Sequence, residues 1–85
     1  MEPPQVTEAG AVFATAKHAA RKATHAARAA YNVLRDAYAD DTLRDDAIAT
    51  YVHAVAARDA AIGAYAVARD FYYATYVAVG AGKES

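Results

Sequence analysis

Five residues in the first half of the chain have the charge and the spacing to bind an anion. Most of them are related by intervals of three or four, which places their side chains on one side of a helix. A basic face of this kind can bind the phosphates of a nucleic acid or an acidic protein surface. It can equally be the solvated side of an amphipathic helix, and both interpretations stay open. The residues are Lys17, Arg21, Lys22, His25 and Arg28.

The histidines do not have the spacing of a metal site. His18 and His25 are seven residues apart, whereas two ligands on one helix are usually four apart. The motifs H-E-x-x-H and Glu-x-x-His, which bind zinc or paired iron ions, do not occur in the sequence. Because the chain also has no cysteine, thiolate sites and disulfides are excluded. We therefore expect no metal and no cofactor.

No group of residues has the pattern of a catalytic site. Ser85 is the only serine, and the carboxylates are dispersed rather than paired. The sequence contains no phosphate-binding loop, dinucleotide fingerprint or nucleophile elbow. We therefore expect that the protein is not an enzyme.

The elements that carry these residues are predicted by a seven-residue alanine repeat. Such a repeat places one stripe of small side chains along a helix and allows a second helix to approach closely. The fold class is therefore all-α, an antiparallel two-helix hairpin with tight alanine-rich packing. The repeat consists of Ala9, Ala16, Ala23, Ala30 and Ala37, followed by Ala47, Ala54, Ala61 and Ala68.

Prolines and residues that favour helix caps predict where the helices begin and end. We expect residues 1–6 to be a flexible lead, because Pro3-Pro4 breaks helices, and Thr7 to cap a helix over about 8–39. The turn falls at 40–42, where Asp41 or Thr42 can cap a second helix over about 43–79. Residues 7–80 thus form one helical-hairpin domain, and residues 81–85 form a tail.

This turn also predicts the register of the two helices and one alternative topology. Residues 62–65 should pack against residues 16–20, so that large side chains on one helix face small side chains on the other. Gly63 could instead break the second helix, which would give a three-helix arrangement.

Four Arg-Asp dipeptides raise the question of where these charges pair. Neighbouring side chains diverge by about 100° on a helix, so we expect no salt bridge within a dipeptide. Arg58 and Arg69 are eleven residues apart, share a face and are expected to pair with carboxylates of another helix or protomer.

The reverse side of the second helix carries small, mostly uncharged residues where a solvated helix would carry charges. It comprises Ala49, His53, Ala56, Ala60, Gly63, Val67 and Ala74. One partner helix cannot cover both sides of this helix, which predicts a four-helix bundle of two hairpins or a larger helical oligomer. Tyrosine-rich surfaces are also favoured at interfaces. The predicted interface residues are Tyr65, Phe71, Tyr72, Tyr73, Tyr76, His53, Ala56 and Gly63.

These features predict a small, non-enzymatic module for helical oligomerisation and protein binding, such as an adaptor, an inhibitor, an immunity-type protein or an assembly protein. A nucleic-acid binder that uses the basic face and a structural subunit of a filament or particle are the alternatives. The first residues do not resemble a secretory signal, and no run of about 18 apolar residues occurs, so we expect a cytoplasmic protein without a membrane partner.

Overall fold

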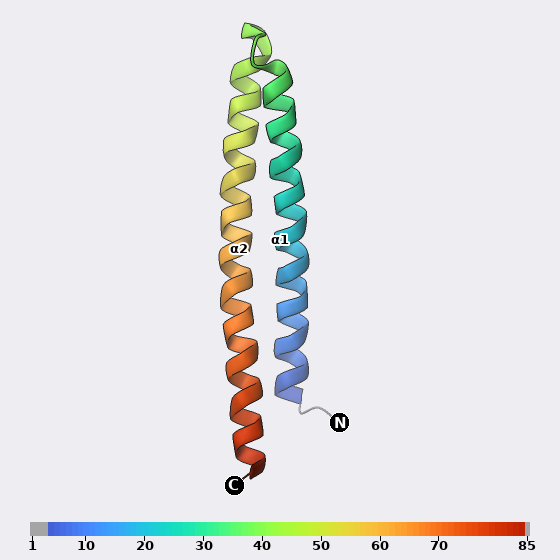
Figure 1. Ribbon diagram of the computed structural model, residues 1–85, viewed down its shortest axis with the longest axis vertical. Coiled ribbons are helices and arrows are strands. Elements are labelled where there is room, and N and C mark those ends of the chain that lie inside the picture. The colour runs from blue at the N-terminus through green and yellow to red at the C-terminus, as the bar shows by residue number, and fades with distance from the viewer. Residues whose placement is uncertain (1–3, 85) are drawn as a thin grey trace.

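The chain forms two long helices that lie side by side and antiparallel along the length of the shorter one (Figure 1). The computed structural model describes residues 4–84, of which α1 comprises Pro4–Ala37 and α2 comprises Asp41–Glu84. The hairpin measures 67 × 17 × 12 Å, so its long dimension is the length of α2. The start of α1 and the end of α2 lie at the same end of the hairpin, where α2 extends beyond the start of α1 (Figure 1).

The two helices meet along the predicted alanine repeat. Among the described residues, the buried apolar side chains are one valine and five alanines, namely Val6, Ala9, Ala27, Ala30, Ala47 and Ala68. The other five alanines of the repeat are half-buried, and none of its members is exposed. The prediction that two helices pack against each other through alanine is therefore confirmed. We call this contact the alanine seam.

Contacts on either side of the seam establish the register. The rings of Tyr31 and Tyr51 lie 5.9 Å apart between centroids, close to the turn. Farther along, Ala20 lines one groove together with Ile62 and Tyr65. The predicted packing of residues 62–65 against residues 16–20 is thus confirmed. Gly63 lies within an uninterrupted α2, which excludes the three-helix alternative.

The turn is capped one residue earlier than expected. Asp40, rather than Asp41 or Thr42, caps α2: its Oδ1 accepts a hydrogen bond of 2.9 Å from the backbone N–H of Thr42. The backbone carbonyl of Asp40 accepts further bonds from the N–H groups of Leu43 and Arg44. Aspartate is favoured here because its carboxylate satisfies an N–H group that has no partner within the helix.

The outer bounds of both helices also differ from expectation. Part of the expected lead, residues 4–6, belongs to α1, and Val6 is only 2% exposed. Proline fits the first turn of a helix because no hydrogen bond within the helix needs its missing N–H. At the other end α2 passes through Gly80 and most of the expected tail to Glu84. Residues 1–3 and Ser85 lie outside the described residues.

The arginine side chains pair differently from the prediction. Arg35, Arg58 and Arg69 each contact the aspartate that follows them in sequence, at 3.2 to 3.3 Å. Arg44 instead contacts Asp41, three residues before it, at 3.1 Å. The expected pairing of Arg58 and Arg69 with another helix of this chain is therefore wrong. The reason is that α1 offers no carboxylate between Glu8 and Asp36, so the long arginine side chain bends to its neighbour.

Because the carboxylate of Asp40 caps α2, the stability of the hairpin should depend on pH. Hydrogen bonds from Thr42, first its hydroxyl and then its backbone N–H, lower the pKa of the Asp40 carboxyl. A lowered pKa in the folded state means that the ionised group stabilises the fold above its unfolded pKa, and that this contribution is lost as the pH falls through the folded pKa. We expect Asp40→Ala to lower the thermal midpoint at pH 7 but to have little effect near pH 2. Asp40→Asn, which can still cap, is the control, and equal losses for Asp40→Ala at both pH values would contradict this role.

Candidate interaction surfaces

An aromatic stack holds the open end of the hairpin together. The ring of Phe13 lies between Tyr65 and Tyr72, at 5.4 and 5.5 Å between centroids and within 27° of parallel. Tyr73 tilts against the same Phe13 ring at 6.2 Å. Three of the predicted interface tyrosines thus contact Phe13 within their own chain, and Tyr65 and Tyr72 are half-buried there.

Two other aromatic side chains of the same segment are largely exposed and make no ring contact with Phe13. Phe71 is 62% exposed and Tyr76 is 58% exposed, although each is large and mostly apolar. Phe71 lines a shallow groove with Val12 and Thr75 on one side of the hairpin. The predicted aromatic interface therefore divides into an inner part that packs on Phe13 and an outer part that faces solvent in the hairpin.

The reverse side of α2 is exposed along its whole length. Each of its seven residues, including His53, Ala56 and Gly63, is exposed in the hairpin. A Cβ atom added to Gly63 would meet nothing within 4 Å. We call this surface the outer face of α2, and it consists of Ala49, His53, Ala56, Ala60, Gly63, Val67 and Ala74.

The predicted basic residues are all exposed on α1. The ion pairs described above engage Arg35, Arg44, Arg58 and Arg69. By contrast, none of Lys17, Arg21, Lys22 and Arg28 forms an ion pair with any described residue. This part of α1 therefore carries positive charge that the rest of the hairpin does not neutralise.

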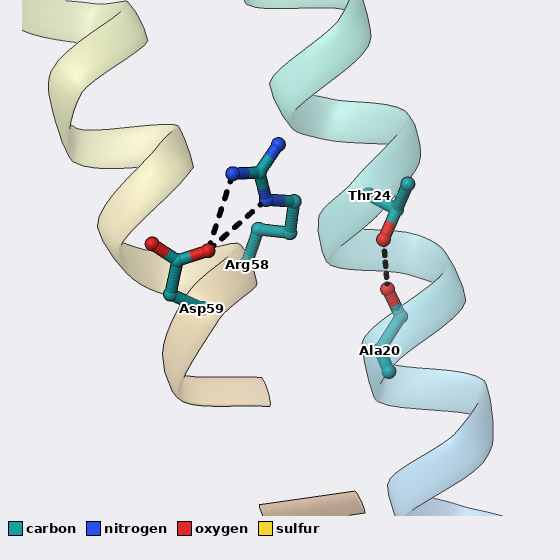
Figure 2. Close-up of polar contacts among 4 residues, drawn as sticks. All are labelled: Ala20, Thr24, Arg58 and Asp59. Carbon is teal, nitrogen blue, oxygen red and sulfur yellow. Dashed lines mark hydrogen bonds and ion pairs between the residues drawn. The ribbon is translucent and has the colours of Figure 1, made fainter. Parts of the chain in front are cut away.

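A groove runs along the seam beside these basic residues. It has a volume of about 350 Å³ and an almost entirely apolar surface. The hydroxyl of Thr24 donates to the backbone carbonyl of Ala20 at 2.8 Å, so this polar group is satisfied within α1 (Figure 2). The groove is lined by Lys17, Ala20, Arg21, Thr24, His25, Ile62 and Tyr65.

A second depression of about 240 Å³ continues the groove toward the turn, and Thr24 lines both. Here Arg58 extends from α2 toward α1 while Asp59 folds back onto its guanidinium (Figure 2). Its lining residues are Thr24, Ala27, Arg28, Tyr31, Tyr51 and Arg58. We call the two depressions together the basic groove; among the described residues that line it, none is acidic.

The sequence predicts the basic residues of α1 but not the groove that most of them line. Of the five predicted residues, Lys17, Arg21, His25 and Arg28 line it, whereas Lys22 does not. The signal that could have revealed it is a series of short side chains at spacings of three and four on α1, opposite long side chains on α2. The series consists of Ala20, Ala23, Thr24 and Ala27. Short residues beside long ones leave a hollow at the edge of a helix pair.

Residues 4–84 do not bring together three or more histidine, aspartate or glutamate side chains that could hold a metal ion. Within the same residues, neither helix contains an apolar stretch sufficient to cross a bilayer.

The chain was also compared with known proteins. It matches no protein-family model, and no curated protein or solved structure is significantly similar to it.

Removing the central ring of the aromatic stack should destabilise the hairpin. We expect Phe13→Ala to lower the free energy of unfolding by about 2–3 kcal/mol, because Tyr65 and Tyr72 lose their shared partner. Val12→Ala is the matched control, since Val12 is 58% exposed and its loss should change little. Urea unfolding followed by circular dichroism measures both, and equal effects of the two substitutions would contradict a structural role for the stack.

The two glycines that lie well inside the helices should respond differently to the same substitution. Gly63→Ala should raise the free energy of unfolding of the dilute protein by about 0.8 kcal/mol, because alanine favours the helix and space is open there. At Gly10 an added Cβ would lie 3.2 Å from Cε2 of Tyr72, so Gly10→Ala should gain less. An equal gain at both positions would show that Gly10 does not make room for the Tyr72 ring.

Proposed function

We propose that this protein is a non-enzymatic helical module that works by self-association and protein binding. In this proposal two hairpins associate through the outer face of α2 and form a four-helix bundle. The observation that carries it is the amount and the position of apolar surface that the hairpin leaves exposed.

The single hairpin exposes more surface than a compact chain of its mass. Its accessible surface is 6244 Å², whereas a folded monomer of 9.0 kDa exposes about 4,900 Å². The radius of gyration is 19.0 Å, against about 12 Å for a compact domain of this length. The excess of about 1,300 Å² per chain is larger than the roughly 800 Å² that each partner contributes to a standard interface.

The exposed apolar side chains are concentrated on α2. Of the thirteen large ones among the described residues, nine lie on α2 and only three on α1. The nine are Leu43, Ile48, Val52, Ile62, Val67, Phe71, Tyr73, Tyr76 and Val77. Large apolar side chains exposed in this number on one helix would be covered if that helix packed against another helix. This distribution favours α2, rather than the charged outer side of α1, as the surface of association.

The small residues of the outer face suit a close helix contact. Ala56, Ala60 and Gly63 carry little or no side chain, so a second helix can approach the backbone there as closely as α1 does at the alanine seam. Larger side chains such as Val67 and Phe71 flank this strip and would be covered by the same approach. The geometry of association would thus repeat the packing that the chain already uses within the hairpin.

A charge placed on the outer face should prevent association. We expect Ala60→Glu to raise the dissociation constant of the self-association at least about tenfold, because an unpaired carboxylate would be buried in the contact. Sedimentation equilibrium across a range of concentrations measures it, with circular dichroism to show that the helices remain. Ala11→Glu, also on an exposed helix position but on α1, is the matched control and should leave association unchanged.

Two outcomes would contradict this proposal. The first is a wild-type protein that remains monomeric at every concentration. The second is an equal effect of Ala60→Glu and Ala11→Glu, which would place the contact elsewhere. Particles that grow without limit as the concentration rises would favour the filament subunit instead of a closed bundle.

A further inference from the structure

We propose that the basic groove binds an acidic amphipathic helix of another protein. This surface is separate from the outer face of α2, so it would remain open when two hairpins associate there. Three observations carry the inference: unpaired cations along one wall, an apolar floor in the first depression, and no unpaired cation on the opposite wall.

The first observation concerns the wall formed by α1. Lys17, Arg21 and Arg28 line the groove and form no ion pair with a described residue. They span eleven residues, or about 16 Å along the helix, which corresponds to three turns of a bound helix. A row of exposed, unneutralised cations attracts carboxylates, and a partner with matching charges gains both rate of encounter and specificity.

The second observation concerns the floor. Ile62 is 46% exposed, and Tyr65 and Ala20 lie beside it, so the first depression of the groove offers mainly apolar contact, whereas the second is more polar. An amphipathic helix inserts apolar side chains into such a groove at positions i, i+3, i+4 and i+7. A partner that was only acidic would leave this floor in contact with water.

The third observation distinguishes a helix from a nucleic acid. On the wall formed by α2 the one cation that lines the groove is Arg58, and it is already paired with Asp59 at 3.2 Å. A strand of phosphates carries negative charge toward both walls, but it would find unpaired cations on the α1 wall alone. A helix can direct its acidic side chains toward α1 alone. In addition, Tyr31 and Tyr51 contact each other at 5.9 Å, so their rings are engaged within the hairpin.

The test uses the full chain and a labelled probe peptide. The probe is a helical peptide of about 14 residues, with leucine at helical spacing on one face and glutamate along one flank. Its anisotropy reports binding to the wild-type protein and to two double variants with the same change in net charge. Arg21→Glu with Arg28→Glu changes the groove, whereas Lys22→Glu with Arg35→Glu changes cations of α1 that do not line it.

We expect the groove variant to weaken peptide binding at least about tenfold and the control variant to weaken it less than about threefold. Ile62→Ser should also weaken binding, whereas Ile48→Ser, on an exposed isoleucine outside the groove, should not. Circular dichroism of each variant shows that the hairpin is intact. A peptide of the same composition, scrambled so that leucine and glutamate mix on every face, should bind at least about tenfold more weakly.

Several results would overturn the inference. Equal effects of the two double variants would show that only the overall charge matters, and equal binding of the scrambled peptide would remove the need for a helix. Tighter binding of a single-stranded oligothymidylate of matched charge would assign the groove to nucleic acid. Loss of self-association in the groove variant would show that the groove binds a second copy of the chain. A wild-type protein that is monomeric but still binds the peptide through the groove would contradict only the proposed four-helix bundle.

Discussion

The close contact of two helices through alanine methyl groups is the constraint on which the rest of this structure depends. Alanine allows two helix backbones to approach, but each methyl group removes little apolar area from water. The seam therefore holds the hairpin in shape although, among the described residues, it buries only Val6 and five alanines. Apart from Val6, the larger apolar residues lie at the edge of the seam or outside it. The exposed surface of α2 and the groove beside α1 are both consequences of this arrangement.

The two helices consequently have different surfaces. The outer side of α1 is charged and can remain in water, whereas residues 47–79 of α2 carry charge only at the two dipeptides Arg58-Asp59 and Arg69-Asp70. The aromatic stack around Phe13 adds ring contacts at the open end, where a two-helix pair would otherwise fray. The Asp40 cap likewise protects the start of α2 from fraying at the turn. Between these two ends the seam consists mostly of alanine, and the edge of the seam there forms the basic groove.

Much of the fold follows from periodicity, and the parts that do not are local. The alanine repeat predicted the seam, and the position of the turn predicted the register. The caps and the ends of the helices are harder to predict from sequence. Asp40, Asp41 and Thr42 can each cap a helix, and only the backbone geometry selects one of them. The prediction for the arginine pairs is wrong because the helical angle between neighbouring residues does not prevent a side chain as long as that of Arg58 from reaching the next residue. The length and flexibility of arginine decide that contact.

The helical character of the chain, its single reversal and the small residues that face the partner helix all follow from the order of its amino acids. These properties depend on helix propensity and on the angle between residues along one helix, both of which can be read from a single chain. The packing of the two helices in space is what distinguishes Tyr65 and Tyr72, which stack on Phe13, from Phe71 and Tyr76, which face solvent. It also decided that Arg21 borders a groove and that Lys22 does not. Such differences depend on the positions along the helix axis at which side chains of the two helices meet. These positions are established only when both helices are packed together.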